Sequence, residues 1–93
     1  MTYDIHWSEK SEKFLEKLPR EISKRIVQKI NSIRENPFHF VEHYEGESYF
    51  KLRVGDYRAL IDIDSSNRLI EIRVVGHRKN IYNQIGKLRN RGD

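Results

Sequence analysis

The chain has 93 residues, enough for one domain with a single small core, so we expect one domain over residues 1–93. It contains no cysteine, which excludes disulfides and cysteine-ligated zinc. No apolar run reaches the roughly 20 residues of a membrane span, and residues 1–10 lack the apolar stretch of a signal peptide. We therefore expect a cytoplasmic protein with no membrane partner.

The net charge of +4 is concentrated at the C-terminal end. Residues 75–93 carry five lysines and arginines against one aspartate, while the charges of the first 74 residues cancel. A neutral body with a basic end is typical of a solvated tail, or of a surface that contacts an anionic partner such as nucleic acid. Charge alone leaves both interpretations open.

Two helices are predicted after a short first strand. Residues 2–7 alternate between apolar and polar side chains, which is typical of a half-buried strand. Ser8 can cap a helix, and this helix should end or kink at Leu18 because Pro19 disfavours helical geometry at the residue before it. Five apolar residues then recur on one face of a second helix over about 20–36: Ile22, Ile26, Val27, Ile30 and Ile33.

A loop is predicted after the second helix. Pro37 should stop the helix, and residues 37–47 show no clean period. His39 and His43 are four residues apart, a spacing that could share a metal on a helix. Pro37 and the lack of further ligands argue against such a site, so we expect neither a metal nor another cofactor.

Three strands are predicted in the second half of the chain, over residues 48–54, 57–64 and 68–77, because each alternates with a period of two. Gly55-Asp56 suits a two-residue type II′ turn, and residues 65–67 suit a second turn. In the last strand the alternation places Ile70, Ile72 and Val74 on one side and Leu69, Glu71, Arg73, Val75 and His77 on the other.

The predicted order is strand, helix, helix, strand, strand, strand, followed by a short C-terminal helix. This order indicates an α+β fold in which a helical hairpin packs on one face of a small antiparallel sheet.

The hairpin that closes at Gly55 and Asp56 should gather positive charge on the face away from the helices. Its register places Arg53 directly opposite Arg58, an arrangement that weakens a sheet. The same face carries three cations and a tyrosine: Tyr49, Lys51, Arg53 and Arg58. Such side chains can simply cover the sheet with their heads in solvent, but so many cations beside residues 76–82 favour a surface for an anionic ligand.

The stretches YFKLRVGDYRALIDID and VVGHRKNIY, preceded by a helical hairpin, resemble the RelE/ParE superfamily of toxins from prokaryotic toxin–antitoxin pairs, and within it the RelE-like branch. The resemblance covers nearly the whole chain. It implies a RelE-like fold and a toxin that cleaves mRNA in the A site of a 70S-type ribosome, without metal, and thereby inhibits translation. It also implies a RelB-like cognate antitoxin as partner, with an acidic or amphipathic segment.

The resemblance implies that the attacking group is the 2′-hydroxyl of the RNA itself. It assigns catalysis to Lys51, Arg58, Arg78 and Tyr82, with His77 as a rival acid or base because imidazole exchanges protons near neutral pH. The arginines suit the phosphorane, since guanidinium stays charged and grips phosphate. Tyr49 stands where RelE-like proteins often carry a further lysine. Contacts with RNA and the ribosome are assigned to Tyr49, Arg53, Arg73, Lys79, Lys87 and Arg89.

Two other functions are compatible with the same fold. The ParE branch poisons DNA gyrase without cleaving nucleic acid, and a non-catalytic protein that binds only RNA or antitoxin is a third alternative. Gyrase poisoning needs no constellation of Lys51, Arg58, His77, Arg78 and Tyr82, so their presence favours the nuclease. An apolar stripe of Ile81, Ile85 and Leu88 should dock on the body of the domain or be replaced by a partner helix.

Overall fold

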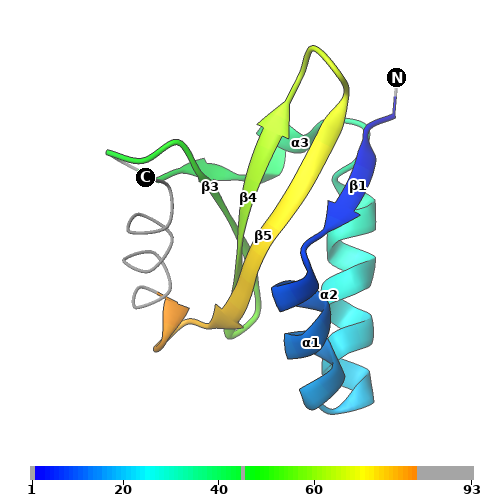
Figure 1. The fold of residues 1–93 in the computed structure, drawn as a ribbon, viewed down its shortest axis with the longest axis vertical. Helices are drawn as coiled ribbons and strands as arrows, with labels where there is room; N and C mark the ends of the chain where they lie inside the picture. The colour runs from blue at the N-terminus through cyan, green and yellow to red at the C-terminus, as the bar shows by residue number, and fades with distance from the viewer. Residues whose placement is uncertain (1, 45, 82–93) are drawn as a thin grey trace.

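The computed structural model describes residues 2–44 and 46–81 of the chain. The elements follow in the order β1 (Asp4–Trp7), α1 (Glu9–Lys17), α2 (Arg20–Ser32), α3 (Pro37–Phe40), β2 (Glu42–His43), β3 (Phe50–Val54), β4 (Tyr57–Asp64) and β5 (Leu69–His77). The strands form one sheet in the order β1-β5-β4-β3-β2, and α1 and α2 pack on one of its faces (Figure 1). The predicted α+β class, with a helical hairpin on one sheet face, is confirmed.

The pairing of β1 differs from the all-antiparallel sheet that was expected. β1 pairs with β5 in parallel, whereas β2, β3, β4 and β5 pair with one another in antiparallel fashion. The alternation of apolar and polar residues predicts a strand but does not report its direction. Among the described helices, none is long and apolar enough to cross a bilayer.

Helix α1 begins and ends where the sequence predicts. Ser8 is its N-cap, and the Ser8 Oγ accepts a hydrogen bond from the backbone N–H of Ser11 at 3.1 Å. Leu18, the residue before Pro19, is its C-cap and has an extended backbone.

Helix α2 ends at Ser32, earlier than predicted, because the chain after it returns to the first strand. The N–H of Tyr3 donates to the carbonyl of Arg34 at 2.9 Å, and the Nε of Arg34 donates to the carbonyl of Tyr3 at 2.8 Å. These bonds give the backbone beyond Ser32 partners outside a helix.

The prediction of a loop over 37–47 is wrong in two places. Pro37 opens the short helix α3, where its missing N–H costs nothing, and the two residues of β2 pair with β3 at the edge of the sheet. Elements of four and two residues are too short to show a period in the sequence.

The main core fills the space between the helices and the sheet. Its buried members are Tyr3, Ile26, Ile30, Ile33, Leu52, Val54, Ala59, Ile61, Ile70, Ile72 and Val75. A second apolar cluster lies on the opposite face of the sheet and consists of Tyr49, Leu60, Val74 and Ile81, with Tyr44 packed against it. Burial of both faces explains why an 11.2 kDa chain places so many of its apolar residues in β3, β4 and β5.

Strand β5 contains a β-bulge that shifts the predicted alternation. In the ladder with β4, Ile72 and Val74 face consecutive residues, so Arg73 is the extra residue between them. Val75 therefore packs in the main core and Val74 in the second apolar cluster, the reverse of the predicted sides. The sequence does not reveal the shift, because Val74 and Val75 are both apolar and either could face the core.

The start of α1 binds the backbone at this bulge. The N–H of Ser8 donates to the carbonyl of Ile72 at 3.0 Å, and the Ser8 Oγ lies 2.8 Å from the carbonyl oxygen of Arg73. The Oγ of Ser11, which is fully buried, donates to the carbonyl of Ile72 at 3.3 Å. Two serines thus fix the helical hairpin to the irregular part of the sheet.

Candidate functional site

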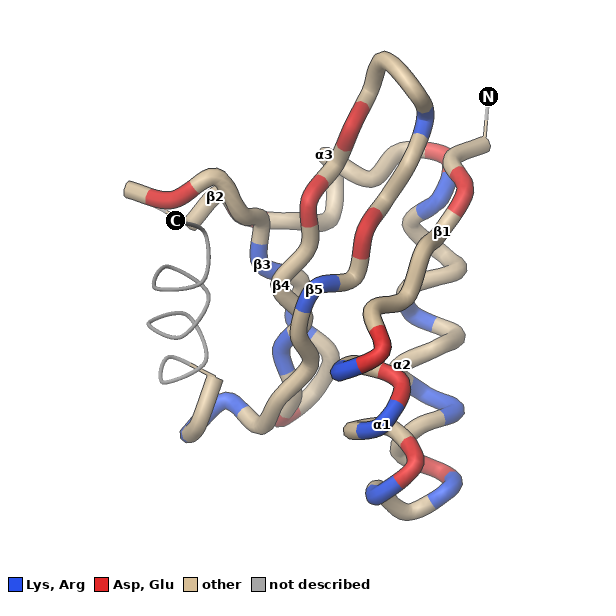
Figure 2. Tube along the Cα trace, viewed as in Figure 1, with Lys and Arg blue, Asp and Glu red and all other residues tan. Residues whose placement is uncertain are grey.

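The end of the sheet that carries the β3–β4 turn holds the candidate site. The ladder pairs Arg53 with Arg58, as predicted, and Gly55 has a φ of +59°, as the first position of a type II′ turn requires. Acidic positions lie toward the opposite end of β4 and β5, while basic positions gather nearer this turn (Figure 2).

Arg58 folds back over the turn. Its Nη1 donates to the carbonyls of Gly55 and Tyr57, at 2.8 Å in each case. These bonds hold the guanidinium at the tip of the hairpin, while Arg53 across the ladder extends into solvent. The arrangement offsets part of the repulsion between two like charges on facing strands.

Arg78 reaches the same turn from the end of β5. Its backbone N–H donates to the carbonyl of Asp56 at 2.8 Å, and its Nε lies 3.7 Å from the Asp56 carboxylate. The Arg78 side chain is 54% exposed, so the ion pair is weak and its guanidinium remains accessible to a ligand. The structure therefore brings Arg58 and Arg78 together at one turn.

Lys51 lies on the same face of β3 as Arg53. Its side chain is 23% exposed, and its Nζ lies 3.8 Å from the carboxylate of Glu42 and 6.0 Å from the centre of the Tyr44 ring. Glu42 is a neighbour that sequence reasoning missed, because two residues of edge strand gave no signal of pairing. Lys51 thus has an acidic neighbour, Glu42.

Tyr49 and Arg73 bind each other instead of facing solvent. Tyr49 is only 6% exposed within the second apolar cluster, and the Arg73 guanidinium lies 5.2 Å from its ring centre. The Nη1 of Arg73 donates to Asp62 at 2.7 Å, and this hydrogen bond raises the pKa of Arg73, with partial burial acting in the opposite direction. The structure thus gives both residues protein partners where the sequence predicted RNA contacts.

His77 lies on the helix side of the sheet, which corrects its predicted place beside Lys51. It pairs with Tyr57 in the ladder, their rings 5.4 Å apart, and Tyr57 packs against the main core. The bulge in β5 causes this change of side. His77 Nδ1 accepts the N–H of Lys79 at 3.2 Å, and the Lys79 side chain is exposed.

Other predicted residues lie outside the described part of the chain, namely Tyr82, Lys87 and Arg89 together with Ile85 and Leu88. Within residues 2–44 and 46–81, no three histidine, aspartate or glutamate side chains form a potential metal site. His39 and His43 pack on different rings, those of Phe40 and Phe50.

The comparison with known proteins agrees with this architecture. Residues 5–82 match the model of the ParE toxin of type II toxin–antitoxin systems, parDE. Among curated proteins, none matches the chain.

Several solved toxin–antitoxin structures share the fold. The RelBE2 complex of Mycobacterium tuberculosis has a TM-score of 0.74 and 25% identity, over 83% of this chain and 99% of that one. The RelE–RelB complex of Pyrococcus horikoshii has a TM-score of 0.73 and 25% identity, over 84% and 97% of the two chains. The RelB–RelE complex of Methanococcus jannaschii has a TM-score of 0.63 and 28% identity, over 84% and 95%. Since the family model spans well over half of the 93 residues, the chain belongs to the ParE toxins of type II toxin–antitoxin systems and is a toxin of the RelE/ParE superfamily.

Proposed function

We propose that this toxin is a ribosome-dependent endoribonuclease that acts in the cytoplasm, cleaves mRNA in the ribosomal A site and inhibits translation. The observation that carries the proposal is the meeting of Arg58 and Arg78 at the Gly55–Asp56 turn. Arg53 and Lys51 lie on the same face of the hairpin. Fold stability gives no reason to gather these cations, because like charges on facing strands destabilise a sheet.

The proposed reaction uses the 2′-hydroxyl of the mRNA as nucleophile. Its oxygen bonds to the adjacent phosphorus while the bond to the 5′-oxygen breaks, which leaves a 2′,3′-cyclic phosphate and a 5′-hydroxyl. A base takes the proton of the 2′-hydroxyl, and an acid gives a proton to the leaving oxygen. Neither step calls for a metal-activated water.

The described residues divide these tasks between them. Arg58 and Arg78 would stabilise the extra negative charge of the phosphorane, because both side chains contact the Gly55–Asp56 turn. Lys51 is our candidate for the base, and its Nζ lies 3.8 Å from the Glu42 carboxylate. For the acid, Tyr82 stays a prediction. We leave His77 out of this set because it lies on the other side of the sheet.

The partner we propose is an antitoxin. The similar structures from Mycobacterium tuberculosis and Methanococcus jannaschii are complexes of a toxin with its antitoxin. A RelB-like partner would present an acidic or amphipathic segment to the hairpin cations. It would also compete for the second apolar cluster, in which Ile81 is fully buried.

The second candidate is a gyrase poison without nuclease activity, which the match to the ParE family model favours. Purified toxin in an in vitro translation reaction, followed by primer extension across the mRNA, separates the two. Cuts at A-site codons that appear only with ribosomes support the nuclease. Intact mRNA together with inhibition of gyrase supercoiling rejects the nuclease and supports the ParE-like function.

A further inference from the structure

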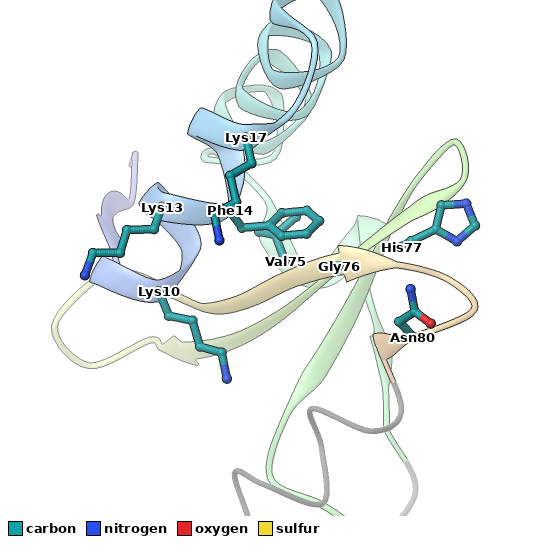
Figure 3. Close-up of a pocket in the computed structure, with 8 residues that line it drawn as sticks. All are labelled: Lys10, Lys13, Phe14, Lys17, Val75, Gly76, His77 and Asn80. Carbon is teal, nitrogen blue, oxygen red and sulfur yellow. The ribbon is translucent and has the colours of Figure 1, made fainter.

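A pocket of about 390 Å³ opens between α1 and the end of β5, on the side of the sheet away from Lys51. Its floor is the ring of Phe14, which lies over Val75 and Gly76 (Figure 3). His77 and Asn80 close its far side. Neither the predicted catalytic cluster nor the second apolar cluster includes the α1 part of this pocket.

The charged residues that line the pocket all have one sign. They are Lys10, Lys13 and Lys17 of α1, and no aspartate or glutamate lines the pocket. The acids of α1 occupy the positions one residue earlier, Glu9, Glu12 and Glu16, so the helix separates its charges into two stripes.

Lys10 and Lys17 lie two turns apart, about 10 Å along the helix axis, with Phe14 between them. Lys13 points away from the ring in Figure 3 and forms a 3.0 Å ion pair with Glu9, in which both side chains are mostly exposed. Exposed pairs of this kind exchange readily for another anion. Lys10 and Lys17 thus provide one cation on each side of the Phe14 ring.

The two lining rings, those of Phe14 and His77, are linked by the Tyr57 ring, which is not part of the pocket lining. The Phe14 and Tyr57 rings are 6.3 Å apart, and the Tyr57 and His77 rings are 5.4 Å apart, each pair in an edge-to-face arrangement. Proteins commonly bind single-stranded RNA with this combination, because cations follow the phosphates while bases stack on aromatic rings. The side-chain amide of Asn80 could also form a hydrogen bond to a base. An acidic protein segment would use the lysines but would gain less from the rings.

The pocket also adjoins the candidate site. His77 ends β5. The next residue, Arg78, is bound to the Gly55–Asp56 turn, which the Arg58 side chain also contacts. A strand of RNA can thus run from the α1 lysines around the end of β5 to the arginines. We propose that the α1–β5 pocket binds a single-stranded segment of RNA, with phosphates at Lys10 and Lys17 and a base against Phe14. This inference rests on the proposed function and adds a second RNA contact to it.

The test is the binding of a short fluorescein-labelled oligoribonucleotide of mixed sequence, measured by anisotropy without ribosomes at several KCl concentrations. Lys10→Gln/Lys17→Gln should weaken binding and lower the slope of log affinity against log salt by about 1.4, at about 0.7 for each single-strand phosphate lost. The matched control is Arg20→Gln/Lys24→Gln, which removes the same charge from exposed positions of α2. It should leave the slope unchanged.

The base contact has its own readouts. Phe14→Leu keeps apolar volume but removes the ring, and it should weaken binding about fivefold or more. Photocrosslinking of the wild-type protein to an oligoribonucleotide that contains 4-thiouridine needs no variant, and it should label peptides from α1 and the end of β5. Equal slopes for the two double variants, or crosslinks that map only to the β3–β4 hairpin, overturn the proposal.

Competition with poly-L-glutamate separates RNA from an acidic protein segment. We expect it to displace the oligoribonucleotide poorly; displacement at equal charge concentration, with Phe14→Leu binding like wild type, overturns the RNA assignment. Because these assays contain no ribosome, they can reject RNA binding in the pocket while A-site cleavage persists. Conversely, a protein that cuts no mRNA can still show the pocket-dependent slope.

Discussion

The backbone N–H of Arg78 donates to the carbonyl oxygen of Asp56 at 2.8 Å, so the end of β5 is held against the β3–β4 turn. This bond does not involve the Arg78 side chain, whose Nε lies 3.7 Å from the carboxylate of Asp56. Truncation of the side chain should therefore remove its charge without moving the strand. The two parts of Arg78 can be separated by experiment.

Arg78→Ala should reduce the single-turnover rate of ribosome-dependent mRNA cleavage by about a hundredfold. A phosphorane carries one more negative charge than the ground-state phosphate, so a cation directed at it acts mainly on the rate. The free energy of unfolding should stay near that of wild type, because the side chain is more than half exposed. Antitoxin affinity should also change little.

Arg53→Ala is the matched control on the opposite strand of the hairpin. Its exposed side chain should contribute to ribosome affinity in a salt-dependent way and much less to turnover. An Arg78→Ala protein that cuts at the wild-type rate would contradict the assignment of the active site, and with it the main reason to prefer the nuclease over the gyrase poison.

Ser11→Ala should lower the free energy of unfolding by about 1–2 kcal/mol, measured by urea denaturation. The Ser11 hydroxyl is fully buried and bonds the carbonyl of Ile72 across the interface of α1 with β5. Ser32→Ala is the control, since its hydroxyl bonds the Lys29 carbonyl on an exposed surface and should matter by less than about 0.5 kcal/mol. Similar losses for both variants would refute a special role for the buried bond.

Arg73 should act on stability and not on RNA binding. Its side chain forms a 2.7 Å bond to Asp62, and both side chains are about one-third exposed. We therefore expect a coupling energy of only about 1 kcal/mol in a double-mutant cycle of Arg73→Met and Asp62→Asn. The affinity of the Arg73→Met protein for ribosomes should match that of wild type. A stable Arg73→Met protein with weakened, less salt-dependent binding would restore the sequence-based assignment to RNA.

The sequence predicted the parts of the fold that depend on local signals, such as helix caps, prolines and tight turns. Ser8 and Pro19 defined α1 because capping and proline geometry are local effects, and Gly55-Asp56 set the β3–β4 register because a two-residue turn leaves one choice. The pairing of Arg53 with Arg58 followed from that register and is confirmed.

The rest depended on contacts that no local pattern reports. The bulge at Arg73 moved His77 to the helix side, and the pairing of β2 placed Glu42 beside Lys51. Tyr49 became buried because the far face of the sheet holds a second apolar cluster. A polar-looking face in a strand pattern does not reveal what will cover it.

Cleavage should persist in EDTA at concentrations that leave ribosomes intact. In the proposed reaction the charge stabilisers are arginines and the nucleophile belongs to the substrate, so chelation would remove nothing that the reaction uses. Activity is measured by primer extension with and without chelator. Loss of cleavage that zinc or manganese restores would revive a metal site that includes His39 and His43, and His39→Ala would then abolish the restoration.

Co-expression of the small reading frame next to the toxin gene should relieve the growth arrest that the toxin causes. The expected antitoxin neutralises the hairpin cations, so the purified complex should lose ribosome binding. Growth arrest that no adjacent product relieves would contradict the proposed partner. Weaker complex formation by an Arg53→Glu variant, through charge reversal, would locate the contact on the hairpin.

The extra residue in β5 also decides on which side of the sheet the following segment attaches. Because of the bulge, Gly76 and not a bulky side chain faces Ile81, and a Cβ at Gly76 would come within 3.0 Å of the Ile81 Cδ1. Removal of Arg73 would leave a regular strand in which Gly76 and His77 keep their partners on β4, because Arg73 is the residue without a partner in the ladder. A one-residue deletion between the bulge and Gly76, for example of Val75, would instead bring His77 opposite Arg58, where Gly76 now leaves room for Ile81. The bulge thus divides β5 into a position where the strand can shorten and a stretch in which its length fixes the side chain that meets Ile81.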